Sequence, residues 1–284
     1  MMFPNKLVLA FDFSKESQKL LNRLSELKSL GIEEVIITYI VDITKSGTYN
    51  PVIKKNRRER LEGVKSKVEE MGFDSVRTDA RLGFPAEEIT SFAENENAMI
   101  LVGSHGKGII KNVFLGSTAY DIIRKAKTPV FIEKVKHSDK IDDITKKVLF
   151  PTDFSKDSKR LFSSVYKSKV PIKEMFLLSV IESSGSEKEL KEENEKRKVE
   201  LEKIKNKFLN LDHIKKIDYK VEQGTASQAI SKTARSEKVS LICLPNRGKG
   251  TIKEMIIGST AKEVARLSPV PVLLFPRGED DPTG

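Results

Sequence analysis

The 284-residue sequence has one cysteine, no tryptophan and no long apolar run. A single cysteine, Cys243, cannot form a disulfide within the chain or supply a cysteine-rich metal site. No stretch approaches the roughly 18 apolar residues that a transmembrane helix needs. The first residues also lack the charged region, apolar stretch and cleavage site of a secretory signal. We therefore expect a soluble, cytoplasmic protein that does not associate with membranes.

Charged residues, in contrast, are abundant, at 32 % of the chain, and 51 Lys+Arg against 41 Asp+Glu give a formal charge of +10. This excess favours anionic partners in general. The charged runs at 54–60 and 186–207 are typical of solvated helix faces, and the second carries Glu–Lys pairs at helical spacing. With no recognition motif beside these runs, we expect no nucleic-acid binding. Three scattered histidines without a carboxylate cluster predict no metal site.

The chain repeats itself. Residues 6–20 align on residues 147–161 at an offset of 141, and residues 106–130 align on residues 248–272 at an offset of 142. Two homologous domains of ordinary size account for this pattern. The expected boundaries are a first domain at 1–137, a linker at 138–146, a second domain at 147–277 and a tail at 278–284.

Within each copy, short apolar runs alternate with runs of helical character. In the first copy we expect strands at 6–11, 33–41, 75–83, 98–103 and 129–134, and helices at 15–30, 57–72, 85–97 and 117–127. Ser14 is placed to cap the first helix, and Pro85 opens the third. The alternation predicts an α/β fold in each copy, with a five-stranded, mostly parallel sheet covered by helices on both faces.

The glycines after the fourth strand suggest a ligand site. Ligands of such sheets bind beyond the carboxyl ends of the strands. Gly103 and Gly106 follow the strand, where glycine permits positive φ and close approach of backbone N–H groups. Gly116-Ser117-Thr118 then opens a helix whose N–H groups suit a phosphate. Asp12, after the first strand, could accept hydrogen bonds from a ribose. The alternative is that these glycines only form turns, with a serine at the helix start.

Two well-known nucleotide signatures are absent, since the sequence has no G-x-x-x-x-G-K-[ST] loop and no G-x-G-x-x-G after the first strand. The spacing Gly103-x2-Gly106-x9-Gly116-Ser117 resembles instead the nucleotide motif of the universal stress protein family. "DFSKES", "DFSKDS", "LGFPAEEI" and the closing "TPVFIEK" and "VPVLLFPR" are also similar to that family. The resemblance covers two tandem copies and implies Rossmann-like domains, with ATP binding where the glycine motif is kept.

The resemblance assigns nucleotide-binding roles in both copies, with Mg²⁺ beside the phosphates. In the first copy these residues are Ala10, Phe11, Asp12, Ile40, Gly103, Ser104, His105, Gly106, Gly116, Ser117 and Thr118. In the second copy they are Pro151, Thr152, Asp153, Val180, Asn246, Gly248, Gly258, Ser259 and Thr260.

Each copy departs from the family pattern once. Ala10-Phe11 stand where the family commonly has Pro-Thr, which the second copy keeps as Pro151-Thr152. In the second copy Pro245 replaces the first motif glycine, and proline offers no N–H and fixes φ. We therefore expect the first copy to hold the principal site and the second copy to bind weakly or not at all.

We thus expect an ATP-binding regulatory or protective module without catalytic residues, rather than a dedicated enzyme. Two alternatives stay open: a slow ATPase or nucleotidyl-transfer enzyme, and an interaction module without nucleotide. The last strand of each copy would lie at a sheet edge, and unpaired apolar edges attract partners. Family members pair through this strand, so the resemblance implies a pseudo-dimer of the two copies within the chain, with further homodimerisation left open.

Overall fold

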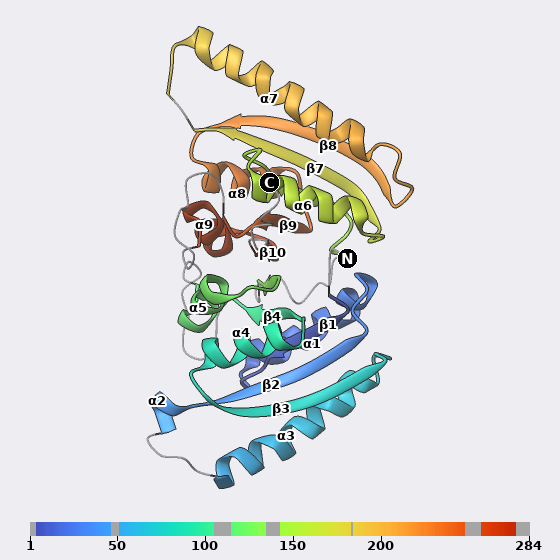
Figure 1. The fold of residues 1–284 in the computed structure, drawn as a ribbon, viewed down its shortest axis with the longest axis vertical. Coiled ribbons are helices and arrows are strands. Elements are labelled where there is room, and N and C mark those ends of the chain that lie inside the picture. Colours follow the sequence, from blue (N-terminus) through green and yellow to red (C-terminus); the bar gives the residue numbers. More distant parts are fainter. Residues whose placement is uncertain are drawn as a thin grey trace, which may run out of the picture. The chain divides into compact units, whose positions relative to one another are not determined.

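Five parallel strands form the centre of each half of the chain in the computed structural model (Figure 1). The structure describes residues 4–46, 51–104, 115–134, 143–182, 184–247 and 257–276. The chain divides into two units, residues 3–141 and residues 142–284. Each is described separately below as the first and the second domain.

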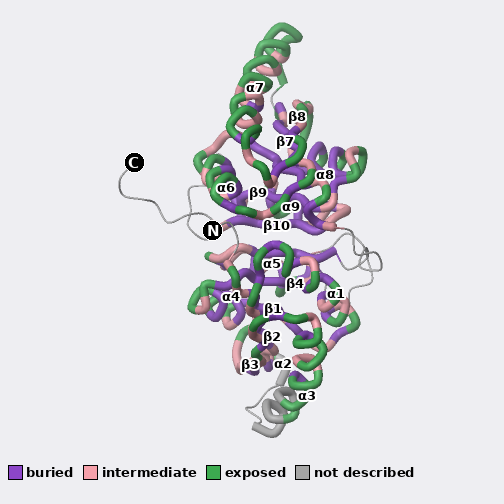
Figure 2. Tube along the Cα trace, turned by 90° about the vertical axis from the view of Figure 1, so that its right-hand side faces the viewer, coloured by how far each residue is buried: buried purple, intermediate pink, exposed green. Residues whose placement is uncertain are grey.

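The first domain has the strand order β3-β2-β1-β4-β5, with parallel pairing throughout. Its strands are β1 (Lys6–Ala10), β2 (Glu34–Asp42), β3 (Ser75–Gly83), β4 (Met99–Gly103) and β5 (Val130–Glu133). Its helices are α1 (Lys15–Ser29), α2 (Ile43–Ser46), α3 (Pro51–Glu69), α4 (Pro85–Asn95) and α5 (Ser117–Lys125). Helices α1 and α4 lie on opposite sides of the strands (Figure 2). Only α2, a single turn after β2, has no counterpart in the predicted element order.

The second domain repeats this arrangement in the order β10-β9-β6-β7-β8. Its strands are β6 (Val148–Pro151), β7 (Ile172–Ile181), β8 (Ile214–Gln223), β9 (Leu241–Pro245) and β10 (Val272–Phe275). Its helices are α6 (Lys156–Lys167), α7 (Glu187–Phe208), α8 (Ala226–Ser236) and α9 (Ser259–Leu267). Helices α6 and α8 again lie on opposite sides of the strands (Figure 2). The predicted fold class, two α/β domains with five-stranded parallel sheets, is confirmed.

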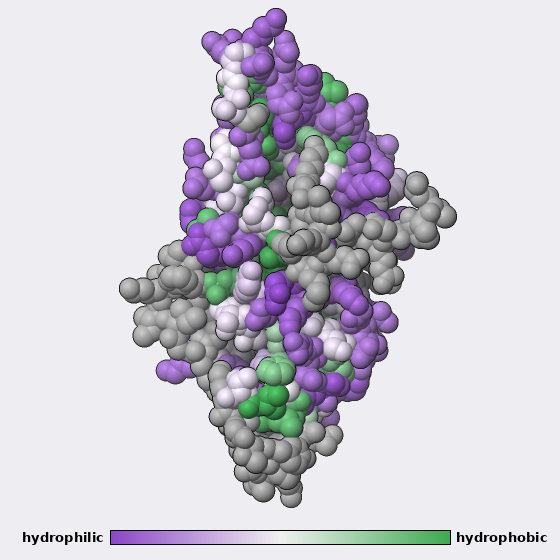
Figure 3. Space-filling view, turned by 60° about the vertical axis from the view of Figure 1, so that its left-hand side comes forward, coloured by the Kyte–Doolittle hydropathy of each residue, from purple (hydrophilic) through white to green (hydrophobic). Residues whose placement is uncertain are grey.

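The cores lie in the central strands. Leu7, Val8 and Leu9 of β1 are fully buried, as are Ile242 and Cys243 of β9. Continuous burial is expected for parallel strands that helices cover on both faces. Burial raises the pKa of the Cys243 thiol well above its usual value, because the thiolate would lose its hydration. Where described, the face in Figure 3 is mostly hydrophilic, with small apolar groups, as the high charge content requires.

A buried ion pair joins helix α1 to strand β5 in the first domain. Arg23 Nε lies 2.6 Å from Glu133 Oε2, and their side chains are only 6 % and 1 % exposed. A second carboxylate, that of Glu26, lies 2.6 Å from Arg23 Nη1. Burial lowers the pKa of Arg23, but the two carboxylates outweigh it and leave this pKa raised. The guanidinium therefore stays charged inside the domain, where it holds the carboxyl end of β5.

Part of the predicted linker packs on the second domain. Ile144 is 1 % exposed, and its carbonyl accepts a hydrogen bond from the Ser240 hydroxyl at 3.0 Å. The Thr145 hydroxyl donates to Asp143 Oδ1 at 2.6 Å, and the Thr145 carbonyl accepts from the Lys173 N–H at 2.9 Å. Residues 143–146 thus belong structurally to the second domain, while residues 138–142 lie outside the described part of the chain.

Candidate functional site

The turn after β1 holds the Asp12 carboxylate at the carboxyl end of the first sheet. Its Oδ1 accepts a hydrogen bond from the Ser14 N–H at 2.9 Å. Phe13 between them has φ 60°, an uncommon conformation for a residue with a side chain. The Ser14 hydroxyl then caps α1 by accepting from the Ser17 N–H at 3.0 Å, as its sequence position predicts.

The turn after β6 has the same construction. Asp153 Oδ1 accepts from the Ser155 N–H at 3.0 Å, and Phe154 also has φ 60°. Ser155 caps α6 through the Ser158 N–H at 3.3 Å. One bond differs: the Ser158 hydroxyl donates to Asp153 Oδ1 at 2.8 Å, whereas the Ser17 hydroxyl donates to the Ser14 carbonyl at 3.1 Å. The Asp153 carboxylate is therefore held from two directions.

The helix that follows the fourth strand of each domain starts at a glycine, and both starts are alike. The Gly116 N–H donates to the Ser104 carbonyl at 2.9 Å, and the Gly258 N–H donates to the Asn246 carbonyl at 2.9 Å. Both glycines are extended, with φ −60° and −61°. The N–H groups of both glycines are thus used within their own domains. The next three N–H groups remain available, since no hydrogen bond within the described residues uses those of Ser117, Thr118, Ala119, Ser259, Thr260 and Ala261.

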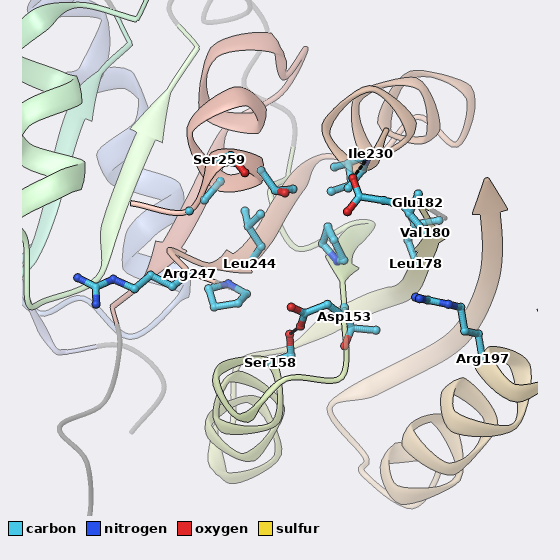
Figure 4. Close-up of a pocket in the computed structure, with 17 residues that line it drawn as sticks. Asp153, Ser158, Leu178, Val180, Glu182, Arg197, Ile230, Leu244, Arg247 and Ser259 are labelled. Carbon is cyan, nitrogen blue, oxygen red and sulfur yellow. Dashed lines mark hydrogen bonds between the residues drawn. The ribbon is translucent and has the colours of Figure 1, made fainter. Parts of the chain in front are cut away.

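A cavity of about 360 Å³ opens at the carboxyl ends of β6, β7 and β9 (Figure 4). This volume is within the range of small-molecule sites. Helix α9 begins at its edge, and α8 forms another wall. The described residues that line it are Pro151, Thr152, Asp153, Ser158, Leu178, Val180, Glu182, Arg197, Ala226, Ile230, Leu244, Pro245, Arg247, Gly258, Ser259, Thr260 and Ala261.

The cavity brings together most of the residues predicted for the second copy. Those lining it are Pro151, Thr152, Asp153, Val180, Gly258, Ser259 and Thr260. Asn246 lies beside it, 7 % exposed, and its backbone N–H donates to the Phe275 carbonyl at 2.7 Å. Gly248 lies outside the described residues. Pro245 ends β9 in register with Phe275 and forms part of the wall.

In the first domain, Asp12, Gly103, Ser104, Gly116, Ser117 and Thr118 lie at the same edge of the sheet, whereas His105 and Gly106 lie outside the described residues. Aromatic rings gather beside Asp12. Phe13 packs edge-on against Phe11 at a centroid distance of 5.2 Å and contacts Tyr39 at 5.3 Å. The Arg60 guanidinium lies 4.2 Å from the Phe13 centroid. Phe11 is buried, while Ala10 and Ile40 are half-buried.

The strand next to β6 offers backbone groups to the cavity. The Leu178 carbonyl accepts from the Thr152 N–H at 2.8 Å. Because backbone groups two residues apart on a parallel strand point the same way, the Val180 N–H and C=O also face the side of β6. Since β6 has ended at Pro151, these groups face the cavity. In the first domain, the Phe11 N–H donates to the Thr38 carbonyl at 2.9 Å. By the same argument, the N–H and C=O of Ile40 face the side of β1.

Arg197 and Glu182 are wall residues that the sequence patterns did not reveal. Arg197 belongs to the charged run interpreted as a solvated helix face, yet its side chain is only 19 % exposed and reaches the cavity from α7. The Glu182 carboxylate accepts from the Ala226 N–H at the start of α8, at 2.9 Å. Ser158 could have been found, because it recurs at the position of Ser17. Arg247 extends away from the other labelled side chains (Figure 4).

No group of three or more His, Cys, Asp or Glu side chains within the described residues could hold a metal ion. No helix within those residues is long and apolar enough to cross a membrane.

Comparison with known proteins gives a consistent result for both halves. The model of the family described as "Universal stress protein family" matches residues 4–134 and residues 145–276. Universal stress protein MJ0577 of Methanocaldococcus jannaschii is 30 % identical over 157 residues, which cover 47 % of this chain and 96 % of that protein. Universal stress protein MJ0531 of the same organism is 30 % identical over 139 residues, covering 45 % of this chain and 81 % of that protein.

A solved structure extends over both halves. The crystal structure of a universal stress protein from Archaeoglobus fulgidus has a TM-score of 0.71 and 26 % identity, and it covers 96 % of this chain and 99 % of its own. A tandem arrangement of two such domains therefore has a precedent of the same length.

Proposed function

This chain belongs to the universal stress protein family, and from that premise we propose that it is an ATP-binding regulatory or protective protein rather than a dedicated enzyme. The observation that carries the proposal is the second-domain cavity. It combines the unused N–H groups at the start of α9, a fixed Asp153 carboxylate and the exposed backbone edge of Val180. These groups match the three parts of a nucleotide.

The proposed division of roles follows the chemistry of each group. The start of α9 would hold phosphate, because its N–H groups and helix dipole favour an anion. Asp153 would accept hydrogen bonds from ribose hydroxyls, and the base would lie along Val180 between apolar walls that include Leu178, Ile230 and Leu244. Mg²⁺ would be carried by the phosphates.

We propose that the first domain holds the principal ATP site. It has the complete glycine motif. The described part of its edge shares three features with the second domain: the Asp turn, the capped helix and the glycine N–H donated back to the strand end. The predicted residues Ala10, Phe11, Asp12 and Ile40 would bind the base and the ribose along this edge. Ser117 and Thr118 supply the phosphate side.

The regulatory rather than enzymatic assignment rests on the carboxylates. Among the described lining residues, only Asp153 and Glu182 carry one, and each already accepts a hydrogen bond from a backbone N–H. A general base has to face the water or substrate that it deprotonates. In the proposed arrangement Asp153 faces the ribose and Glu182 faces the start of α8. Binding would instead act by stabilising the ordered form of the domain by mass action.

The first experiment is mass spectrometry of ligand released from the freshly purified chain, followed by thermal unfolding during ATP titration with Mg²⁺. ATP at a hundred times Kd should stabilise the binding domain by about 2.7 kcal/mol. Gly116→Glu places a carboxylate at the start of α5 and should remove binding at the first site, while Gly258→Glu does the same at the second. A chain that releases no nucleotide and shows no shift with ATP contradicts the proposal.

A further inference from the structure

Arg197 gives the second-domain cavity a charged recognition group. The first copy has Arg57 at the equivalent position, and that side chain lies outside the described part of the chain. It comes from the middle of α7 and lies across the cavity from Ser259 at the start of α9 (Figure 4). The two donor groups therefore face different ends of any ligand held between them. If the phosphates lie at α9, Arg197 faces the base or ribose end.

The guanidinium is fixed by two hydrogen bonds. Its Nε donates to Glu193 Oε1 at 2.8 Å, and Nη1 donates to the Ser179 hydroxyl at 2.8 Å. Ser179 is fully buried and in turn donates to the Thr152 carbonyl at 3.1 Å. Arginine carries five N–H groups, and the other three meet no acceptor within the described residues. Arg197 is thus a rigid, donor-only group with spare donors on the cavity wall.

Its charge is already compensated. The Glu193 carboxylate lies 2.8 Å from Nε, and Asp153 is a further carboxylate among the lining residues. A second phosphate at this end would therefore meet little net positive charge. Neutral acceptor atoms of a base suit the spare donors better.

Purine bases differ in the acceptors they offer to such a group. Guanine and hypoxanthine present O6 and N7 side by side, and a guanidinium can bind both at once. Adenine presents N7 beside the N6 amino group, which is itself a donor and opposes another donor. The backbone edge of Val180, with one N–H and one C=O, suits either kind of base.

We propose that the second-domain cavity is a site for 6-oxopurine nucleotides, with Arg197 as the residue that selects guanine or hypoxanthine over adenine. This inference rests on the proposed function, because it requires a nucleotide with its phosphates at α9. The first copy has an arginine, Arg57, at the equivalent position, so the inference concerns the second domain alone. In the first domain, the position of Ser179 on the strand is occupied by Tyr39, whose ring contacts Phe13.

The test is calorimetric titration of the full-length Gly116→Glu chain, in which the first site is closed, with GTP, ITP and ATP in the presence of Mg²⁺. GTP and ITP should bind about tenfold more tightly than ATP, since a bidentate arginine–guanine contact discriminates by about five- to 150-fold. The analogue 7-deaza-GTP, which lacks the N7 acceptor, should lose most of this advantage on the same protein.

The matched variants lie next to each other on α7. Arg197→Met should bring the GTP-to-ATP ratio of affinities close to one, whereas Lys198→Met, which removes a 45 % exposed cation paired with Glu195, should leave the ratio unchanged. Thermal unfolding checks that both variants fold, and the 7-deaza comparison needs no change at Arg197.

The outcomes separate the two proposals. Equal or tighter binding of ATP, a ratio that Arg197→Met does not change, or no nucleotide binding to the Gly116→Glu chain would each overturn the 6-oxopurine site. The ATP proposal for the first site is read independently from the Gly258→Glu chain. If that chain takes up ATP while the Gly116→Glu chain shows no preference for GTP, only the 6-oxopurine inference fails.

Discussion

The two domains share the same backbone arrangement at the carboxyl edge of the sheet but place different side chains on it. In both, an aspartate turn with φ 60° at the following phenylalanine leads into a serine-capped helix. Beside that turn, the first domain packs Phe11, Phe13 and Tyr39 ring against ring. The second domain has Thr152 and Ser179 at the positions of Phe11 and Tyr39, and a cavity beside them. The hydrogen-bonded frame is therefore independent of the side chains that fill it, and specificity can diverge while the frame is kept.

The largest contrast between the two domains is the buried ion pair between the first helix and the last strand, which only the first domain's sequence allows. The first domain buries Arg23 against Glu133 at 2.6 Å, whereas the equivalent positions of the second domain are Ser164 and Phe275. Glu133→Gln removes one of the two carboxylates that compensate the buried Arg23 and leaves Glu26 as the other, so it should destabilise the first domain by up to about 3 kcal/mol. Urea unfolding measures the loss.

The double variant Arg23→Met with Glu133→Leu is the control, because replacing a whole buried pair by apolar groups is often neutral. It should recover most of the loss. If Glu133→Gln does not change the urea midpoint of the first domain, or lowers that of the second domain instead, the ion pair does not stabilise the first domain as described.

The helix caps test whether the frame is energetically the same in both domains. Ser14→Ala and Ser155→Ala each remove a side-chain acceptor from the first turn of a helix. Each should cost about 1 kcal/mol, and each should affect its own domain. The measurement is the urea midpoint of each transition, with Ser14→Asp and Ser155→Asp as variants that keep a capping oxygen. Clearly unequal losses would break the equivalence of the two turns.

The smallest effect should come from the serine that differs between the copies. Ser158 holds the Asp153 carboxylate at 2.8 Å, while the Ser17 hydroxyl donates to a backbone carbonyl. Ser158→Ala should weaken nucleotide binding at the second site about threefold, because one ordinary hydrogen bond orients the ribose acceptor. Ser17→Ala, the matched change, should leave ATP affinity at the first site nearly unaltered. Calorimetric titration measures both, and equal effects would contradict the difference drawn between the two serines.

The sequence was sufficient for the fold because the repeat and the local signals agree. The aligned copies, the apolar runs and the caps at Ser14 and Ser155 each depend on neighbouring residues, which a single sequence displays. These signals give the same answer in both copies, so an error in one would have been visible in the other.

The site was only partly predictable, and the reasons are geometric. Nothing local shows that Arg197, within a charged helical run, reaches past the end of β6, because this depends on where one strand stops beside its neighbour. Likewise, the Gly116 N–H donates to the Ser104 carbonyl across eleven intervening residues, ten of which lie outside the described part of the chain. Local sequence signals do not reveal such a contact. The prediction of Pro151, Thr152, Asp153 and Ser259 as neighbours came from family resemblance, which carries geometry that residue types alone do not.

The buried thiol of Cys243 makes the chain its own reporter. It is the sole cysteine of the sequence, it is fully buried in β9 two residues before Pro245 at the cavity wall, and burial raises its pKa. A thiol reagent can therefore modify the native protein only during excursions that expose the second sheet. The rate at which the reagent labels Cys243 therefore measures how often the second sheet opens. Because a ligand in the cavity stabilises the closed form, its binding can be followed as slower labelling of this one thiol.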